Sequence, residues 1–490
     1  MLKPKVFYVI LVFYSVSSFG SLSWWNRATF YEIFVRSFQD SDGDGHGDLR
    51  GITQRLNYLQ SLGIQGIWLT PIFPSRSYHG YDATDYYTVD PQYGRLEDFN
   101  NLVKEAHTRG IRVILDIAVN HTSDSHPWFS QLHDWYVWRE KPQPWGNWYP
   151  IGNEYYYSVF DRSMPNLNWR NPMVLKEVKA LLKFWMRQGA DGFRLDAARY
   201  YAPGPQGEAD TIDTHQAIAA FASDVRSEFP EVLFIGEIWA DSATIHSYCQ
   251  SGRELDLGFN FPLSFPLIDT LNSEDPEPFA RALREYELTF QDPRQSAPFL
   301  TNHDMTRTAS MLWNYLPKIK LAAEVYFMLP GTPFLYYGEE LGLPNGQNRD
   351  DRDKRQPMQW ENEKGFGFSS AKPWYSFYGE GDKFSVAAQK SQPDSVLELY
   401  RKLIQLRNGS NILSQGNLSE VKYHEGLLQW TRTYQEQKAL VVVNFSYLPS
   451  NPQPIAPHHK VLNLLYGSVK PTQDVIPSLP PHSVHVFRVE

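Results

Sequence analysis

The sequence has very little cysteine and no excess of positive charge. Its 490 residues include a single cysteine, Cys249, which has no intramolecular partner for a disulfide. This excludes a disulfide-stapled scaffold and a cysteine-based structural zinc site. Lysine and arginine number 46 against 55 aspartate and glutamate residues, a formal net charge of −9. Binding to nucleic acid or to an anionic membrane depends on clustered positive charge, so we expect a neutral partner instead.

Aromatic residues, in contrast, are abundant. The chain has 15 Trp, 29 Tyr and 29 Phe, which together make up 15% of its residues. This is more than a core alone usually needs, and aromatic faces stack on the flat apolar faces of ligands. The length also exceeds the roughly 250 to 300 residues at which a single core stops growing, so we expect two or three domains around one large architecture.

The N-terminal segment, residues 1–20, has the features of a secretory signal. Lys3 and Lys5 precede an apolar stretch from Val6 to Phe19, and small residues follow near its end. The alternative is a membrane anchor, but the stretch is shorter than the roughly 20 apolar residues that cross a bilayer. We therefore expect a secreted or periplasmic protein without stable membrane insertion.

From residue 28 onward, short β-rich runs alternate with amphipathic helical stretches, which is the pattern of a parallel sheet built from βα units. We predict strands at residues 29–34, 65–69, 111–117, 192–195, 232–238, 255–261, 298–301 and 333–337. One helical stretch follows each strand, and eight such pairs make a TIM barrel. The predicted barrel comprises residues 21–120 and 172–410. Residues 411–490 alternate in the manner of a C-terminal antiparallel β-sandwich.

Residues 121–171 interrupt this rhythm as an irregular insertion rich in tryptophan and tyrosine. The insertion falls in the third βα loop, which opens on the carboxyl-end face of the barrel where active sites form. Its aromatic side chains are therefore expected to wall a binding cleft. A small subdomain packed on itself is the alternative, and the two interpretations are compatible.

Four predicted strands end in acidic or amide-containing motifs, and the carboxyl ends of barrel strands are where catalytic residues lie. In chain order the motifs are Asp116-Ile-Ala-Val-Asn120-His121, Gly192-Phe-Arg194-Leu-Asp196, Gly236-Glu237-Ile-Trp239 and Thr301-Asn-His303-Asp304. Each motif alone is weak evidence. Their occurrence together, in this order, is strong evidence for one shared site.

With these motifs the sequence resembles the α-amylase family of glycoside hydrolases (family 13) over essentially the whole mature chain. The resemblance implies that Asp196 is the nucleophile, Glu237 the general acid/base, and Asp304 the carboxylate that binds substrate hydroxyls and stabilises the transition state. It also implies a set of substrate-binding residues, with Tyr81 stacking under the sugar: Tyr81, Asp82, His121, Arg194 and His303.

The chemistry of glycoside cleavage gives the same pair of carboxyl groups separate tasks. One carboxylate meets the positive carbon of an oxocarbenium-like state, and one carboxylic acid protonates the leaving oxygen. Retaining enzymes hold the pair roughly 5 Å apart, where two charges repel by about 3 kcal/mol, so one of the two stays protonated. Arg194 lies two residues before Asp196 on the same strand face. We expect it to favour ionised Asp196 and to leave the raised pKa to Glu237.

A glycine-rich acidic loop follows the first predicted strand. Oxygen ligands on alternate residues suit Ca²⁺, but the twelfth position is Gly51, which excludes an EF-hand. The loop resembles a structural calcium loop of the oligo-1,6-glucosidase and intermediate branches of the family, in which the residue at His46 contributes its backbone carbonyl. A solvated acidic turn is the alternative. The predicted ligands are Asp40, Asp42, Asp44, His46 and Asp48.

Three further motifs indicate an intermediate branch, between the oligo-1,6-glucosidases and the neopullulanases. They are Met164-Pro-Asn166-Leu-Asn168, Ala197 directly after Asp196, and Arg355-Gln-Pro-Met-Gln-Trp360. Relatives that act on α-1,6 bonds tend to carry Val in place of Ala197, so α-1,4 cleavage is favoured.

From these features we expect a monomeric, exported, retaining α-amylase that hydrolyses internal α-1,4 bonds of starch or maltodextrins. An α-glucosidase, a neopullulanase or a glucosyl-transferring relative is the runner-up, because transfer and hydrolysis share one glycosyl-enzyme. A non-catalytic subunit of an amino-acid transporter is disfavoured, because such subunits have a transmembrane helix and lose catalytic carboxylates.

Overall fold

The computed structural model describes residues 23–490, except 206, 364, 380–382, 455–458 and 471–474. The predicted signal segment, residues 1–20, lies outside the described residues. Among the helices in the described part of the chain, none is both long enough and apolar enough to cross a membrane.

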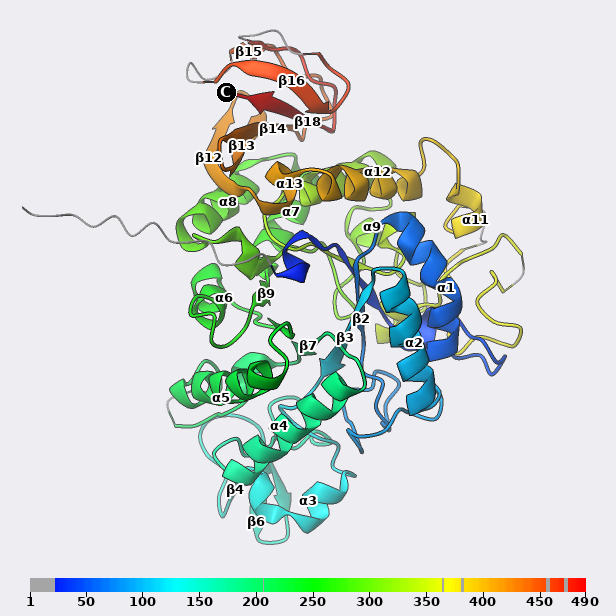
Figure 1. The fold of residues 1–490 in the computed structure, drawn as a ribbon, viewed down its shortest axis with the longest axis vertical. Coiled ribbons are helices and arrows are strands. Elements are labelled where there is room, and N and C mark those ends of the chain that lie inside the picture. The colour runs from blue at the N-terminus through cyan, green and yellow to red at the C-terminus, as the bar shows by residue number, and fades with distance from the viewer. Residues whose placement is uncertain (1–22, 206, 364, 380–382, 455–458, 471–474) are drawn as a thin grey trace, which may run out of the picture.

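Eight parallel strands form the centre of the molecule (Figure 1). They are β1 (Phe30–Ile33), β2 (Gly66–Leu69), β3 (Arg112–Ile117), β7 (Gly192–Leu195), β8 (Leu233–Gly236), β9 (Leu257–Phe259), β10 (Ser296–Ala297) and β11 (Phe334–Tyr336). Their order in the sheet is β10-β9-β8-β7-β3-β2-β1-β11. A parallel bridge between Phe299 and Phe334 joins the two ends. The sheet is closed, so the predicted TIM barrel is confirmed.

Helices cover the outside of the barrel. The long ones are α1 (Leu49–Leu62), α2 (Leu96–Thr108), α4 (Pro172–Arg187), α5 (Ile212–Glu228), α6 (Ser242–Cys249), α7 (Phe261–Ser273), α8 (Glu277–Thr289), α10 (Leu316–Phe327) and α12 (Val396–Asn408). Short helices α9 (Thr308–Met311) and α11 (Val386–Gln389) lie in the loops that follow β10 and β11.

Two predictions of the strand–helix pattern were wrong, and proline explains both. The pattern predicted one helix after the sixth strand, whereas α7 and α8 both follow β9. Pro266 lies inside α7, and because proline is disfavoured in a helix interior, the sequence of α7 does not look helical. The seventh strand was predicted at residues 298–301, but β10 ends at Ala297. Pro298 has no N–H for the ladder, and the carbonyl of Pro298 accepts a hydrogen bond from Phe334 instead.

The barrel strands are buried on both faces, so their residues alternate between two apolar cores. In β3, Val113 and Leu115 join the core beneath the helices, whereas Ile114 joins the core inside the barrel. This inner core is rich in aromatic rings, and Phe30 stacks on Phe334 with ring centroids 4.5 Å apart. The inward position that follows Ile114 is Asp116, at the carboxyl end of the strand. The aromatic inner core therefore forms the floor under the polar strand ends.

The insertion lies at one end of the molecule in Figure 1. It contains helix α3 (Pro127–Gln131) and a three-stranded antiparallel sheet of β4 (Trp138–Arg139), β5 (Trp148–Ile151) and β6 (Glu154–Tyr157). Most of its aromatic rings contact one another: Phe129 stacks on Trp138 at 5.5 Å, and Trp145 meets Trp148 at 5.3 Å. The insertion is therefore largely packed on itself, as the alternative interpretation of this segment proposed.

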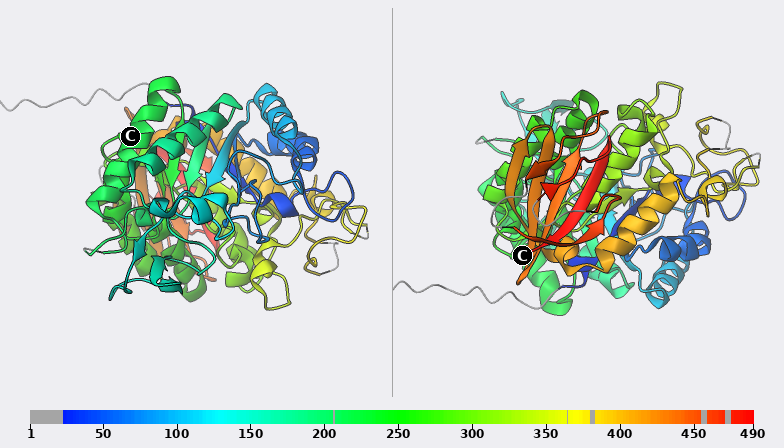
Figure 2. Two further views of the ribbon diagram at one scale, coloured as in Figure 1. Left: turned by 90° about the horizontal axis from the view of Figure 1, so that it is seen from below. Right: turned by 90° about the horizontal axis from the view of Figure 1, so that it is seen from above.

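The C-terminal strands form a five-stranded antiparallel sheet and a two-stranded one, visible in front of the barrel in the right-hand view of Figure 2. They are β12 (Asn417–His424), β13 (Leu427–Tyr434), β14 (Gln437–Asn444), β16 (Val461–Tyr466) and β18 (Ser483–Val489), then β15 (Gln453–Pro454) with β17 (Val475–Ile476). One face of the large sheet joins the main core through Trp430, and Ile476 packs on the other face. This layering confirms the predicted antiparallel β domain.

Candidate active site

Inward-pointing polar side chains from four barrel strands meet above the aromatic floor. They are Glu32 on β1, Trp68 on β2, Asp116 on β3 and Arg194 on β7. Their chain neighbours, such as Phe193 and Leu195 beside Arg194, belong to the outer core. Successive side chains of a strand point to opposite faces of the sheet. Because the apolar neighbours point outward into the core beneath the helices, the polar side chains between them point into the barrel.

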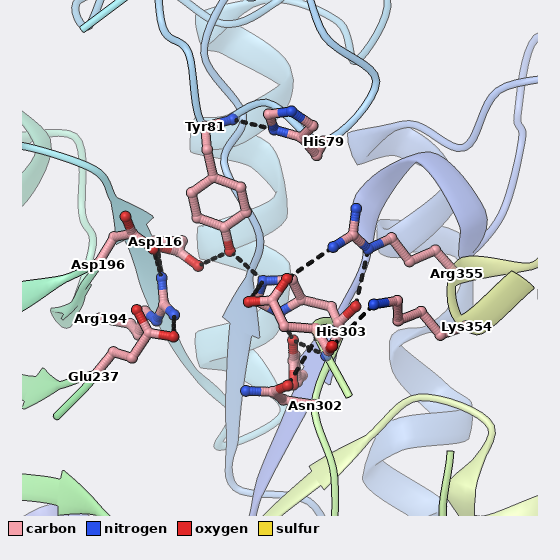
Figure 3. Close-up of polar contacts among 12 residues, drawn as sticks. His79, Tyr81, Asp116, Arg194, Asp196, Glu237, Asn302, His303, Lys354 and Arg355 are labelled. Carbon is pink, nitrogen blue, oxygen red and sulfur yellow. Dashed lines mark hydrogen bonds and ion pairs between the residues drawn. The ribbon is translucent and has the colours of Figure 1, made fainter. Parts of the chain in front are cut away.

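Arg194 is the centre of the first charge network (Figure 3). Its Nη1 donates to Asp116 Oδ1 at 2.9 Å and to Asp196 Oδ1 at 2.5 Å. Its Nη2 lies 3.0 Å from Glu237 Oε1. The guanidinium is fully buried, 0% exposed. One cation therefore joins three carboxyl groups from three neighbouring strands and holds Asp196 beside Glu237.

Backbone geometry completes the placement of this carboxyl pair. Ala197 follows Asp196 in the left-handed region, with a φ of 47°. In that conformation the N–H of Ala197 donates to Glu237 Oε2 at 3.0 Å. Glu237 is thus bound through one oxygen to Arg194 and through the other to the chain directly after Asp196.

Burial shifts the titration of both carboxyl groups upward. It raises the pKa of Asp196 to about 6, with Arg194 opposing the shift, and it raises the pKa of Glu237 in the same way. Arg194 does favour the ionised form of Asp196, as expected, but the raised pKa is not left to Glu237 alone, because that of Asp196 is raised as well. The reason is that the guanidinium is shared with Asp116 and Glu237, and its one charge does not offset the burial of three acids.

His303 is the centre of a second charge network, which meets the first at Tyr81. Its Nδ1 lies 2.5 Å from Glu32 Oε1, and its Nε2 lies 3.1 Å from Asp304 Oδ2. The hydroxyl of Tyr81 is 2.6 Å from the same Nε2 and donates to Asp116 at 2.9 Å. Although burial opposes the charged imidazolium, Asp304 and Glu32 raise the pKa of His303 to about 10. His303 is therefore a cation.

Asp304 lies between this cation and a second one. Arg355 donates through Nη2 to Asp304 Oδ1 at 2.8 Å and through Nε to the carbonyl of His303 at 2.9 Å. Burial alone would raise the pKa of Asp304, but His303 and Arg355 hold it well below its usual range. Asp304 is therefore ionised at pH values at which burial still favours the protonated forms of Asp196 and Glu237.

The remaining predicted sugar-binding residues have different surroundings. His121 Nε2 lies 3.1 Å from the carbonyl of Tyr81, and burial lowers its pKa to about 4, so it is neutral. Its ring contacts Phe160 of the insertion at 5.5 Å. Asp82, in contrast, accepts hydrogen bonds from the hydroxyls of Ser75 and Ser77. The structure joins His121 to the site through Tyr81, while Asp82 organises the preceding loop.

Several members of the site were not singled out as such from the sequence. Glu32 and Trp68 are single residues inside apolar strands, and only the closed barrel brings them to His303 and Asp116. Lys354 donates to the carbonyl of Asp304 at 2.9 Å. Arg355 begins the predicted Arg355–Trp360 motif, which was used only to choose a branch. Its position directly after the charged run at residues 350–354 was the available signal.

A hollow of about 430 Å³ lies between the loop after β8 and helices α7 and α8. Its wall includes Trp239 and Phe265, whose exposed fractions are 45% and 39%. Trp239 stacks on Phe261 with centroids 4.5 Å apart, and Arg199 donates to its carbonyl. Trp239 follows Glu237 by two residues, so this aromatic surface begins just after the end of β8, while none of the catalytic carboxyl groups lines the hollow.

The acidic loop after β1 brings three of its five predicted ligands together. Carboxylate oxygens of Asp40, Asp42 and Asp48 lie within 4.8 Å of one another. Three carboxylates supply the hard oxygen donors that Ca²⁺ prefers, so the donor set fits such an ion. Asp44 does not belong to this group of carboxylates, and the group does not bear on the backbone carbonyl predicted for His46. The carboxylate of Asp44 instead accepts from the backbone N–H of His46 at 2.7 Å.

Protein-derived hydrogen bonds fix two of these three carboxylates. Asp40 accepts from the backbone N–H groups of Asp42, Gly43 and Gly45. Asp48 caps the N-terminus of α1 by accepting from Gly51 at 2.7 Å. Asp42 is exposed and accepts one long bond, 3.3 Å from the N–H of Asp44. Of the three carboxylates, Asp42 therefore contributes least to the hydrogen bonds that hold the loop together.

The sequence and the fold match those of known proteins. The family model for the α-amylase catalytic domain matches residues 32–416. An α-amylase (Alpha-amylase 3) of Dictyoglomus thermophilum is 38% identical, over 91% of this chain and 90% of its own. An oligo-1,6-glucosidase of Parageobacillus thermoglucosidasius is 29% identical, over 86% and 90%. The crystal structure of an α-amylase from H. orenii superimposes with a TM-score of 0.82 at 34% identity, covering 94% of this chain and 99% of that one.

Removing the charge of Arg194 is expected to make stability depend more steeply on pH. Asp116 and Asp196 have folded pKa values of about 6, above those of the unfolded chain, so they favour folding at low pH and this contribution is lost as pH rises through about 6. In Arg194→Met these pKa values rise further, and the loss grows and extends to higher pH. We expect destabilisation of about 3–5 kcal/mol at about pH 8 and clearly less at about pH 5.

Thermal unfolding of both proteins across this pH range measures the effect. Arg112→Met is the matched control, because Arg112 is 42% exposed and pairs with Asp191 outside the site. A pH dependence of Arg194→Met that parallels the wild type would contradict the assignment of Arg194 as the cation shared by these acids.

Proposed function

The chain belongs to the α-amylase catalytic-domain family and is a glycoside hydrolase, and from that premise we propose that it is a retaining α-amylase cleaving internal α-1,4-glucosidic bonds of starch and maltodextrins. The observation that carries the proposal is the pairing of Asp196 and Glu237 on one buried guanidinium, that of Arg194. Two carboxyl groups side by side are what glycoside cleavage with retention requires.

The proposed mechanism uses the two acids in turn. Asp196 attacks the anomeric carbon while Glu237 gives its proton to the glycosidic oxygen, so the bond to the leaving sugar breaks as the glycosyl–enzyme bond forms. Glu237, now ionised, takes a proton from water, which attacks the anomeric carbon and releases Asp196. Glu237 is assigned as the acid because the strand-end motif implies it, and burial raises its pKa, which favours the protonated form.

Asp304 has a separate electrostatic task. It is the carboxylate that His303 and Arg355 keep ionised, so its negative charge is present throughout the reaction. A fixed negative charge next to the sugar stabilises the positive charge that develops in the oxocarbenium-like transition state. Arg355, which donates to Asp304, also donates to the hydroxyl of Tyr78 at 2.8 Å.

Replacing either acid is expected to stop hydrolysis of maltopentaose while leaving the fold intact. Asp196→Asn and Glu237→Gln should each lower kcat by about a thousandfold or more, because each removes a group that acts in the transition state. Maltosyl fluoride separates the two roles, since fluoride leaves without protonation. Glu237→Gln should regain glycosylation on this substrate, and Asp196→Asn should not.

Asp269→Asn is the matched control, because Asp269 is exposed on α7 and makes no contact with the site. Near-normal hydrolysis of maltopentaose by either acid variant, or equal responses of both variants to maltosyl fluoride, would overturn the assignment.

Internal cleavage is favoured by the aromatic surface that begins at Trp239, two residues after Glu237. A leaving group with several sugars needs an extended surface on that side, and the exposed rings of Trp239 and Phe265 provide one. An α-glucosidase or an oligo-1,6-glucosidase is the competing assignment, and several relatives carry the latter name. The products on starch and pullulan distinguish them: long maltooligosaccharides early indicate an α-amylase, glucose alone an α-glucosidase, and panose a neopullulanase.

Trp239→Ala is expected to lower kcat/KM on maltoheptaose by about tenfold, the loss that follows removal of one good stacking contact. Activity on maltosyl fluoride should stay unchanged, because that substrate has no sugar on the leaving side. Tyr423→Ala serves as the control, since Tyr423 is a 40% exposed aromatic residue on β12. Equal losses on both substrates would show that Trp239 does not bind the leaving group.

We also propose that the acidic loop binds Ca²⁺ as a structural ion, through Asp40, Asp42 and Asp48. Calcium bound to the native state alone stabilises it by about 2.7 kcal/mol at a hundredfold excess over Kd. In Asp42→Asn the rise in melting temperature on adding calcium to chelator-treated protein should therefore shrink or vanish. Asp134→Asn, whose side chain is 92% exposed outside the loop, should respond like the wild type. An undiminished calcium response of Asp42→Asn would refute this site.

Export remains part of the proposal and rests on the N-terminal sequence, with Lys3 and Lys5 ahead of an apolar stretch. Cell fractionation tests it, and recovery of the full-length chain from the cytoplasm alone would count against it.

A further inference from the structure

A second aromatic surface lies where the barrel meets the C-terminal sheet, and it shares no residue with the active site. Trp313, in the turn between α9 and α10, is 84% exposed, more than any other large apolar residue in the described part of the chain. Tyr315 of the same turn is 49% exposed. Tyr447, in the loop after β14, is 64% exposed. These three residues line one hollow of about 300 Å³.

The turn presents Trp313 to solvent at a cost in backbone strain. Trp313 and Asn314 both have a φ of 57°, in the left-handed region that large side chains rarely adopt. The turn is fixed by hydrogen bonds from Asn314 to the carbonyl of Ala309 at 2.8 Å and from Tyr315 to Leu312 at 3.0 Å. A strained backbone that holds an aromatic ring away from the core is typical of a functional position.

The charged side chains around the hollow are paired with groups of opposite charge or with hydrogen-bond partners. Glu274, at the end of α7, lies 3.1 Å from Lys318 and 3.4 Å from His482. Its other oxygen accepts from the backbone N–H of Tyr447 at 3.0 Å. Glu274 therefore positions the C-terminal loop against the barrel, and its charge is compensated locally. The amide of Asn272 completes the polar rim.

We propose that this surface, defined by Trp313, Tyr315 and Tyr447, is a second binding site for an α-glucan chain, outside the catalytic cleft. Exposed aromatic faces bind the apolar faces of sugar rings, and the paired ions and amide at the rim suit neutral hydroxyl groups. A strongly charged ligand finds no uncompensated partner among the described rim residues. The inference rests on the proposed action on α-glucans and adds a site that anchors the polymer while the cleft acts on it.

Native gel electrophoresis in the presence of soluble starch tests the proposal, because binding to the polymer retards the protein. The experiment is made in the Glu237→Gln background so that starch is not consumed. Adding Trp313→Ala and Tyr447→Ala together should weaken the apparent affinity for starch by about tenfold. In the otherwise wild-type enzyme the same pair should leave kcat/KM on maltotriose unchanged, since so short a substrate does not reach from one site to the other.

Tyr423→Ala is again the matched control and should be retarded like its parent. An unchanged melting temperature shows that the double variant is folded, as expected for side chains that are largely exposed. Equal retardation of the double variant and its parent would overturn the proposal while hydrolysis of maltotriose leaves the proposed function standing. A change in oligomeric state without a change in retardation would assign the surface to protein contacts and would also overturn it.

Discussion

The buried guanidinium of Arg194 is the interaction on which the site depends. Three carboxyl groups at the ends of three barrel strands would repel one another strongly in a medium of low polarity. Arg194 binds Asp116, Asp196 and Glu237 at once and is itself 0% exposed. Its contacts require β3, β7 and β8 to keep their mutual register, because a shift by one residue would turn a carboxylate into the outer core. The aromatic floor of the barrel fixes that register from below.

A second network makes the acids of the site unequal. His303, charged by its contacts with Glu32 and Asp304, and Arg355 together place two cations beside Asp304. Asp196 and Glu237 share one cation with Asp116, and burial raises their pKa values. The protein thus separates a permanent anion from a pair of acids whose pKa values burial raises. Sugar chemistry needs both kinds of group, and here the difference arises from the number of cations that each acid contacts.

The sequence predicted those parts of the molecule whose signals are local. The motifs around Asp116, Asp196, Glu237 and Asp304 are each a short continuous run at the end of a predicted strand. Counting eight strand–helix pairs was therefore enough to predict that these motifs meet at one end of a barrel. Glu32 and Trp68 were missed because each is one residue in an apolar strand, and only closure of the barrel gives it a partner. Long-range contacts also explain why Asp196 shares the raised pKa that was expected of Glu237 alone, since the sharing of Arg194 among three acids is not visible along the chain. The insertion shows the same limit: its composition predicted stacking surfaces, but most of its rings stack on one another.

A buried arginine of the C-terminal sheet, Arg432, binds a barrel segment, and a second buried arginine, Arg407, fixes that segment within the barrel. Arg407, on α12, donates to the carbonyls of Phe327, Leu329 and Gly331 after α10. Arg432, on β13, donates to Met328 in the same segment and to Leu413 and Gly416 before β12. Burial lowers the pKa of Arg432 to about 9, and leaving either set of carbonyls without donors would be costly. Tyr447 is therefore held in place relative to Trp313 before any ligand arrives, which lowers the entropic cost of binding across the two parts of the chain.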